Sequence, residues 1–278
     1  MKTKRFALIA LCAIIFISIT TISCKRENGL KLPKYRSAQD NAIAEKLYGD
    51  VFNKADDAAR NYGSKGGKDV STCPVYTVSG YIFPITVTMD FGSGCVGSDG
   101  LTRRGKIISV ISLPYTDSTS TVISHCENFH VLYGLTDYTI TGRQVITNVG
   151  HNNLGHHIFT VVVDSSAISF TESGTVKTIT WRCNRQNEWI EGDNTWLNIF
   201  DDVYLVTGTS DGNDINGDPF QLNITNPLRI QMSCGYITAG TLEIINPGYP
   251  TITVDYGTGA CDNAFTVTVN GMTFPYVM

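Results

Sequence analysis

The hydrophobic pattern of this chain changes its period near residue 70. Between Ser37 and Gly63, apolar residues recur every three or four positions, a spacing that places them on one face of an α-helix. The stripe consists of Ala44, Leu47, Val51, Ala55, Ala58 and Tyr62. Ser37 is a good N-cap with Asp40 three residues later, and Gly63 is a typical C-terminal stop. The pattern predicts a helix over residues 37–63.

From about residue 70 onward, apolar and polar residues alternate, which is typical of β-strands. The segments 86–91 and 264–269 are the most regular, and Asn270-Gly271 is a strong hairpin turn after the second. Further strands are expected at 106–113, 138–147, 157–163, 176–183, 202–209, 220–225, 228–234, 241–245 and 251–256. The connections are too short for crossover helices, so the pairing should be antiparallel.

These patterns predict an all-β fold over residues 70–278, preceded by one N-terminal α-helix. Strands with one apolar and one polar face suit an antiparallel β-sandwich, and they equally suit a long twisted meander. The composition agrees, because glycine is frequent and Thr, Ser, Val and Ile dominate the region. We expect the apolar stripe of the helix to pack on the β domain of the same chain.

Residues 1–23 have the layout of an export signal. Lys2, Lys4 and Arg5 form a basic start, and an apolar run follows from Phe6 to about Thr20. This run is shorter than the roughly 20 residues that a membrane-spanning helix needs. We therefore expect cleavage after the run, and no later segment is apolar for as long.

The tetrapeptide Thr21-Ile22-Ser23-Cys24 resembles the lipobox of bacterial lipoproteins. That resemblance implies that Cys24 becomes the lipidated first residue, carrying acyl chains such as palmitate, and that residues 24–36 form a polar tether. Each buried methylene contributes ~0.8 kcal/mol, so two or three chains anchor the protein firmly. The alternative is an ordinary secretory signal in which Cys24 has no special role.

Charge argues against nucleic acid as a partner. Loss of residues 1–23 removes three basic residues and no acidic ones, which leaves 18 basic against 25 acidic residues. No block of Lys or Arg occurs in the remaining chain.

Six cysteines remain after the signal and the lipidated residue are set aside. They are Cys73, Cys95, Cys126, Cys183, Cys234 and Cys261. An even number in an exported chain permits up to three disulfides, and the sequence does not choose among the pairings. The alternative is that they are free, buried thiols that pack as small apolar residues.

No catalytic or metal-binding constellation is evident, so we expect neither an enzyme nor a cofactor. The segment 208–212 fits the G-x-S-x-G pattern but lacks the strand-to-helix context and is predicted to be a turn. The acidic segment 211–218 does not fit the EF-hand spacing. His151, His156 and His157 lie within seven residues, but His156 and His157 would face opposite sides of a strand and so should not share a metal.

Trp189 and Trp196 are the candidate ligand-binding residues. They flank a polar stretch at 191–194, where exposed rings could stack on sugars. The alternative is that they fill the core, as aromatic residues usually do in β proteins.

One turn pattern occurs twice. Residues 85–95 and 252–261 share an Asp-aromatic-Gly-x-Gly turn followed by a cysteine, with Asp90 and Asp255 in equivalent places. Together with the Cys-Asp-Asn at 261–263 and the strand after it, this pattern resembles a family of Bacteroidota (Bacteroides-type) outer-membrane lipoproteins of uncharacterised activity. The resemblance implies an outer-membrane address and a β fold, and it transfers no catalytic residue.

The sequence thus predicts a lipid-anchored cell-envelope protein with a non-catalytic binding or structural role. The alternative is a glycan-binding or fimbria-like adhesin subunit. Its expected partners are a membrane, through the lipid, and a glycan or another envelope protein. Surface and periplasmic orientations both stay open, because Lys25-Arg26-Glu27 is not the acid-rich stretch expected of a surface-export signal.

Overall fold

The predicted helix is present as α1 (Tyr35–Tyr62), the first element of the computed structural model, which describes residues 35–62 and 73–277. The predicted apolar stripe is buried from Ala44 to Ala58. Ser37 lies inside the first turn instead of capping it, and its hydroxyl donates to Asp214 in the turn between β9 and β10. Cys24, the signal peptide and the tether up to residue 34 lie outside the described residues.

The rest of the described chain forms one antiparallel sheet of fourteen strands. They are β1 (Val75–Ser79), β2 (Ile85–Asp90), β3 (Cys95–Val96), β4 (Thr102–Ile111), β5 (Thr121–Tyr133), β6 (Thr136–His151), β7 (His157–Glu172), β8 (Thr175–Glu191), β9 (Val203–Asn213), β10 (Pro219–Gln231), β11 (Ile237–Ile245), β12 (Ile252–Thr258), β13 (Ala264–Val269) and β14 (Met272–Val277). Two short 3-10 helices, η1 (Asp193–Thr195) and η2 (Ile199–Asp201), connect β8 to β9. Each strand pairs with the next one along the chain, except that β2 pairs with β4 and the short β3 pairs only with β4. The fold is therefore the predicted meander and not a sandwich.

Several strand predictions need correction. The strands β1 and β5 were not predicted, and the two strands expected between 220 and 234 are one, β10, with irregular register. The segment 208–212, predicted as a turn, runs inside β9. The hairpin at Asn270-Gly271 is confirmed, and both of its residues have positive φ, as such a turn requires.

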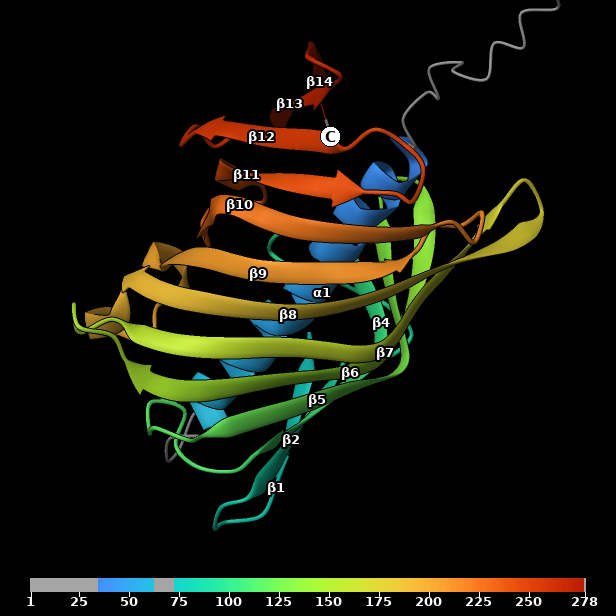
Figure 1. Ribbon diagram of the computed structural model, residues 1–278. Helices are drawn as coiled ribbons and strands as arrows, with labels where there is room; N and C mark the ends of the chain where they lie inside the picture. The colour runs from blue at the N-terminus through green and yellow to red at the C-terminus, as the bar shows by residue number, and fades with distance from the viewer. Residues whose placement is uncertain (1–34, 63–72, 278) are drawn as a thin grey trace, which may run out of the picture. The chain divides into compact units, whose positions relative to one another are not determined.

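The sheet curls so that α1 lies in its concave side. Figure 1 shows the helix crossing the strands obliquely, with β8 to β10 on one side and β4 on the other. Long strands twist and coil naturally, which brings distant strands toward one helix. Alternate residues of β8 face inward and are buried, beginning with Ile179 and Trp181. The core therefore consists of the inner face of the sheet and the helix.

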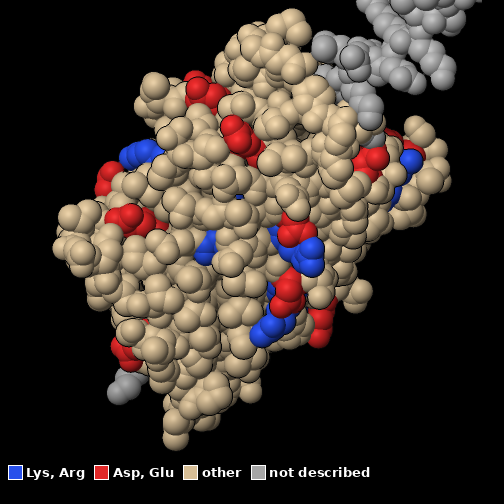
Figure 2. Space-filling view, in the orientation of Figure 1, with Lys and Arg blue, Asp and Glu red and all other residues tan. Residues whose placement is uncertain are grey.

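The outer face of the sheet is polar but not strongly charged. Figure 2 shows basic side chains beside acidic ones on the visible face, with wide uncharged areas between them. Exposed ion pairs between neighbouring strands include Arg182–Asp211 and Arg143–Asp164. Within the described residues, no helix has the length and apolarity that crossing a membrane requires.

Two disulfides are formed instead of the three that the sequence permits. Cys73 pairs with Cys95, and Cys234 pairs with Cys261. The other two predicted candidates, Cys126 and Cys183, are free thiols.

The repeated turn is a structural device. Asp90 accepts a hydrogen bond from the backbone N–H of Gly92 at 2.8 Å, and Asp255 accepts one from Gly257 at the same distance. Each aspartate thus closes its own turn, as Asp commonly does. In both copies, the cysteine that follows is half of a disulfide.

Candidate functional site

Helix α1 carries buried polar side chains that bond to the surrounding sheet. Asn41 accepts a hydrogen bond from Trp181 Nε1 at 3.0 Å, and the Tyr48 hydroxyl donates to the Thr141 carbonyl at 2.5 Å. Asp40 accepts from the backbone N–H of Ile215 at 2.9 Å. These bonds fix both the rotation and the depth of the helix in the concave side.

An arginine from β4 holds the middle of the helix. Arg103 is 1% exposed and binds Asp50 through two nitrogens, at 2.8 and 2.6 Å. Asp99, from the turn before β4, contacts the same guanidinium. Burial by itself would raise the pKa of Asp99, but hydrogen bonds and charge from Arg103 outweigh it and lower that pKa to about 2.

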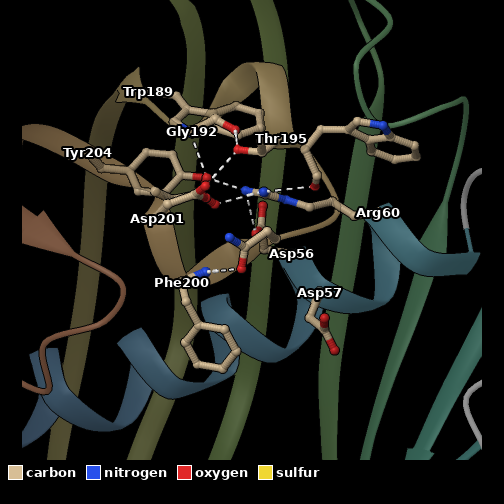
Figure 3. A network of polar contacts seen from close by, with 12 residues as sticks. Asp56, Asp57, Arg60, Trp189, Gly192, Thr195, Phe200, Asp201 and Tyr204 are labelled. Atoms are coloured by element: carbon tan, nitrogen blue, oxygen red, sulfur yellow. Dashed lines mark hydrogen bonds and ion pairs between the residues drawn. The ribbon is translucent and has the colours of Figure 1, made fainter.

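The C-terminal end of the helix is held by a second buried arginine. In Figure 3, Arg60 extends from α1 toward Tyr204 and Trp189 on the sheet. Its two terminal nitrogens lie 2.7 Å from carboxylate oxygens of Asp56 and of Asp202, and one of them donates to the Tyr204 hydroxyl at 2.6 Å. The guanidinium carbon lies 4.2 Å from the centre of the Trp189 ring, within cation–π distance.

This cluster places two carboxylates against one arginine, all without solvent exposure. Burial raises the pKa of Asp202 to about 6, with Asp56 adding to the effect and Arg60 opposing it. Arg60, Asp56 and Asp202 therefore hold this end of the helix against the sheet. The carboxyl of Asp202 takes up a proton in mildly acidic solution.

Between these anchors, α1 and the sheet leave a cavity of about 550 Å³. Helix residues from 42 to 53 form one wall, and the inner faces of β6 to β10, with Tyr256 of β12, form the other. Its apolar lining includes Val161, Val163, Val206, Leu228, Ile230, Phe52 and Tyr256. The volume lies in the range of small-molecule binding sites.

Four buried polar atoms around this cavity have no hydrogen-bond partner. They are Nε and Nη1 of Arg185, Oε1 of Gln144 and Oδ1 of Asn187. All three side chains are at least nine-tenths buried. Arg185 reaches Glu45 of the helix through its remaining nitrogen, Nη2. Gln144 donates through Nε2 to the Tyr48 carbonyl at 3.3 Å, so its oxygen is directed elsewhere.

Loops next to the two disulfides border the cavity. On one side lie Ser98 and Asp99, shortly after Cys95, and on the other lie residues 232–237, which include Cys234. Lys46 of the helix donates to the Gly235 carbonyl at 2.9 Å. The disulfides therefore brace the segments that border the cavity.

The buried thiol of the cavity is a poor nucleophile. Cys183 lines the cavity, but burial raises the pKa of this thiol to about 12, so the nucleophilic thiolate is scarce at neutral pH. In the part of the chain that the structure describes, no three His, Cys, Asp or Glu side chains are placed to hold a metal ion.

The two predicted ligand-binding tryptophans have different environments. Trp189 is 1% exposed, stacks near Tyr204 and donates from Nε1 to Asp202 at 3.1 Å. The expectation that it is exposed for stacking on a glycan is therefore wrong, because it is part of the core beside Arg60. Trp196 is partly buried against the core, and its carbonyl accepts from Arg60 at 3.2 Å.

The three clustered histidines are not brought together as one group. His156 precedes β7 and lies 2.7 Å from Glu188, whereas His157 faces His151 with their Nε2 atoms 3.2 Å apart. This separation of His156 from His157 follows from their neighbouring positions in the chain.

Arg185, Asn187, Gln144 and Glu45 were missed by sequence reasoning. A signal for two of them exists, because Arg185 and Asn187 continue the inward alternation of Trp181 and Cys183 along β8. Had the strand been extended past Cys183, a charged residue on its buried face would have been apparent.

Comparison of this chain with protein-family models, with curated proteins and with solved structures finds no match.

Proposed function

We propose that this protein is a lipid-anchored cell-envelope protein that binds a small molecule, without catalysis, in the cavity between α1 and the sheet. The observation that carries the proposal is the set of four unpaired polar atoms around one cavity of about 550 Å³. A buried polar atom without a partner costs ~1–3 kcal/mol, and proteins rarely leave several together. A ligand that bonds to them recovers this cost.

The surroundings support a preformed site. Anchors at Asp40, Asp50 and Arg60 hold the helix along its length, so the cavity does not depend on one contact. A rigid site loses little conformational entropy when it binds, which favours affinity.

The binding proposal is tested with N-phenyl-1-naphthylamine, an uncharged apolar fluorophore. The full chain carries Cys24→Ser as a common background, so that no acyl chain at residue 24 competes for the cavity. Val206→Phe fills the cavity from β9, and Thr209→Phe places the same ring on an exposed position of that strand. We expect saturable binding that Val206→Phe weakens at least tenfold and that Thr209→Phe leaves unchanged. Equal binding by both variants would refute the proposed site.

The membrane address rests on Cys24 and the apolar run before it. The resemblance to Bacteroidota outer-membrane lipoproteins supports the same address. We expect the unaltered chain to stay with membranes after a carbonate wash and Cys24→Ala to be released. A Cys24→Ala chain that remains with the membrane would contradict lipid anchoring.

The fimbria-like alternative has less support, because assembly through added strands needs open sheet edges. β1 has only five residues and follows Pro74, and β14 contains Pro275. Short edge strands and prolines are typical means of preventing edge-to-edge pairing.

A further inference from the structure

We propose that the ligand of the cavity is an uncharged amphipathic molecule, with an apolar body and a head that carries both hydroxyl and carbonyl groups. This inference rests on the proposed binding function and names its ligand class. Three independent properties of the cavity support it: its balance of charge, the mixture of donors and acceptors left unpaired, and the apolar part of its lining.

The charged groups around the cavity already compensate one another. Glu45 contacts Arg185, while Asp50 and Asp99 share Arg103. Because two carboxylates share Arg103, one negative charge is left over. The positive charge of Lys46, which donates to a backbone carbonyl, balances it. A ligand with a net charge would therefore add an unpaired ion to a partly buried site, which is costly.

The unpaired atoms need a head group that both donates and accepts. Arg185 offers N–H donors at Nε and Nη1, whereas Gln144 and Asn187 offer carbonyl oxygens as acceptors. A carboxylate would bond to Arg185 but cannot donate to the two amides. An ammonium group would donate to the amides but cannot accept from Arg185. Hydroxyl groups next to a carbonyl or ester oxygen satisfy both.

The apolar part of the lining favours a ligand with an apolar body. The valines Val161 and Val163 of β7 and Val206 of β9 lie beside Leu228 and Ile230 of β10. A space of about 550 Å³ corresponds to many water molecules, at ~30 Å³ each. Filling it with an aliphatic group removes these side chains from water and adds to the affinity.

Three probes with the same eight-carbon chain test the inference by displacing the fluorophore from the full chain with Cys24→Ser. They are 1-monooctanoylglycerol, which is neutral, octanoate, which is an anion, and octyltrimethylammonium, which is a cation. We expect the glycerol ester to bind at least tenfold more tightly than either ion.

Two variants that change a charge and one that removes an acceptor test the ligand class further. Arg185→Met leaves Glu45 without its partner, so the glycerol ester should weaken at least tenfold and the cation should gain. Glu45→Gln frees Arg185 from its partner, so octanoate should gain instead. Gln144→Leu removes one acceptor with little change in volume, and it should weaken the ester without favouring either ion. These opposite shifts cannot arise from a general loss of folding.

The outcomes separate the two proposals. If the fluorophore binds in the cavity but octanoate or the cation competes as well as the ester, the ligand class is wrong and the binding function stands. If the fluorophore does not bind, or binds equally to Val206→Phe, the binding function itself fails.

Discussion

The buried carboxyl of Asp202 makes a sharp prediction about how stability depends on pH. In the folded protein its pKa is about 6, raised by burial from an ordinary value of 3.8. Between those two values, the folded state holds a proton that the unfolded state has released. Stability therefore falls as pH rises through this window and becomes level above it.

The size of the effect follows from the two pKa values. A difference from 3.8 to about 6 sets an upper limit of about 3 kcal/mol, at about 1.4 kcal/mol per unit. Between pH 4 and pH 7.5 most of this limit is realised, roughly 2 kcal/mol. Burial also raises the pKa of Asp40, Glu45 and Asp57, which acts in the same direction, while the lowered pKa of His157 opposes it.

Asp202→Asn isolates the contribution of this one group. The amide keeps an oxygen that accepts from Trp189 Nε1, but it does not titrate. The matched control is Asp201→Asn at the neighbouring position, which is exposed.

Urea unfolding followed by tryptophan fluorescence gives the free energy of unfolding at each pH. From pH 4 to pH 7.5, we expect the wild type and Asp201→Asn to lose about 2 kcal/mol more than Asp202→Asn loses. Parallel profiles for the wild type and Asp202→Asn would show that this carboxyl does not retain its proton in the folded state, which would refute the reasoning.

Three further predictions concern stability, each measured as the free energy of unfolding in urea. Arg103→Met should lose about 3–5 kcal/mol because Asp50 is left buried without its partner, whereas Arg104→Met, whose pair with Asp137 is exposed, should lose at most about 1 kcal/mol; similar losses would contradict the role given to burial. Gly105→Ala should be destabilised far more than Gly100→Ala: both have φ near 80°, but only at Gly105 would the added Cβ meet the Asn128 carbonyl oxygen, at 1.9 Å. Replacing Cys234 and Cys261 by serine should cost about 3 kcal/mol, and alkylation of the unreduced, denatured wild type should label Cys126 and Cys183 but neither of these two; labelling of Cys234 would contradict the pairing.

The main features of the fold were predictable because they depend on local periodicity. The helix and most strands follow directly from patterns with periods of 3.6 and 2. β5 was missed because its alternation is interrupted: the register shifts between His125 and Phe129, and Asn128 has positive φ. An irregularity of this kind moves the later side chains to the other face and hides the strand from a simple pattern.

The buried charges of α1 were not predictable from the same reasoning. A stripe argument assumes that the face opposite the apolar residues is in water. Here the sheet curls around the helix, so Asp50, Asp56 and Arg60 are buried as well. Their partners Arg103 and Asp202 come from distant parts of the chain. Only the three-dimensional curvature of the sheet brings them together.

Two of the buried arginines, Arg60 of α1 and Arg185 of β8, differ in a way that separates structure from function. Both terminal nitrogens of Arg60 face carboxylates, and an aromatic ring covers its plane. Arg185 has one nitrogen on Glu45 and two without partners beside a cavity. Arg60 leaves only Nε without a partner and does not line the cavity, whereas Arg185 retains two donors beside the cavity, at a cost in stability. If the unpaired donors of Arg185 are retained for a ligand, Arg185→Met should cost less stability than Arg60→Met but should weaken binding of the glycerol ester. A folded Arg60→Met protein should bind the ester normally.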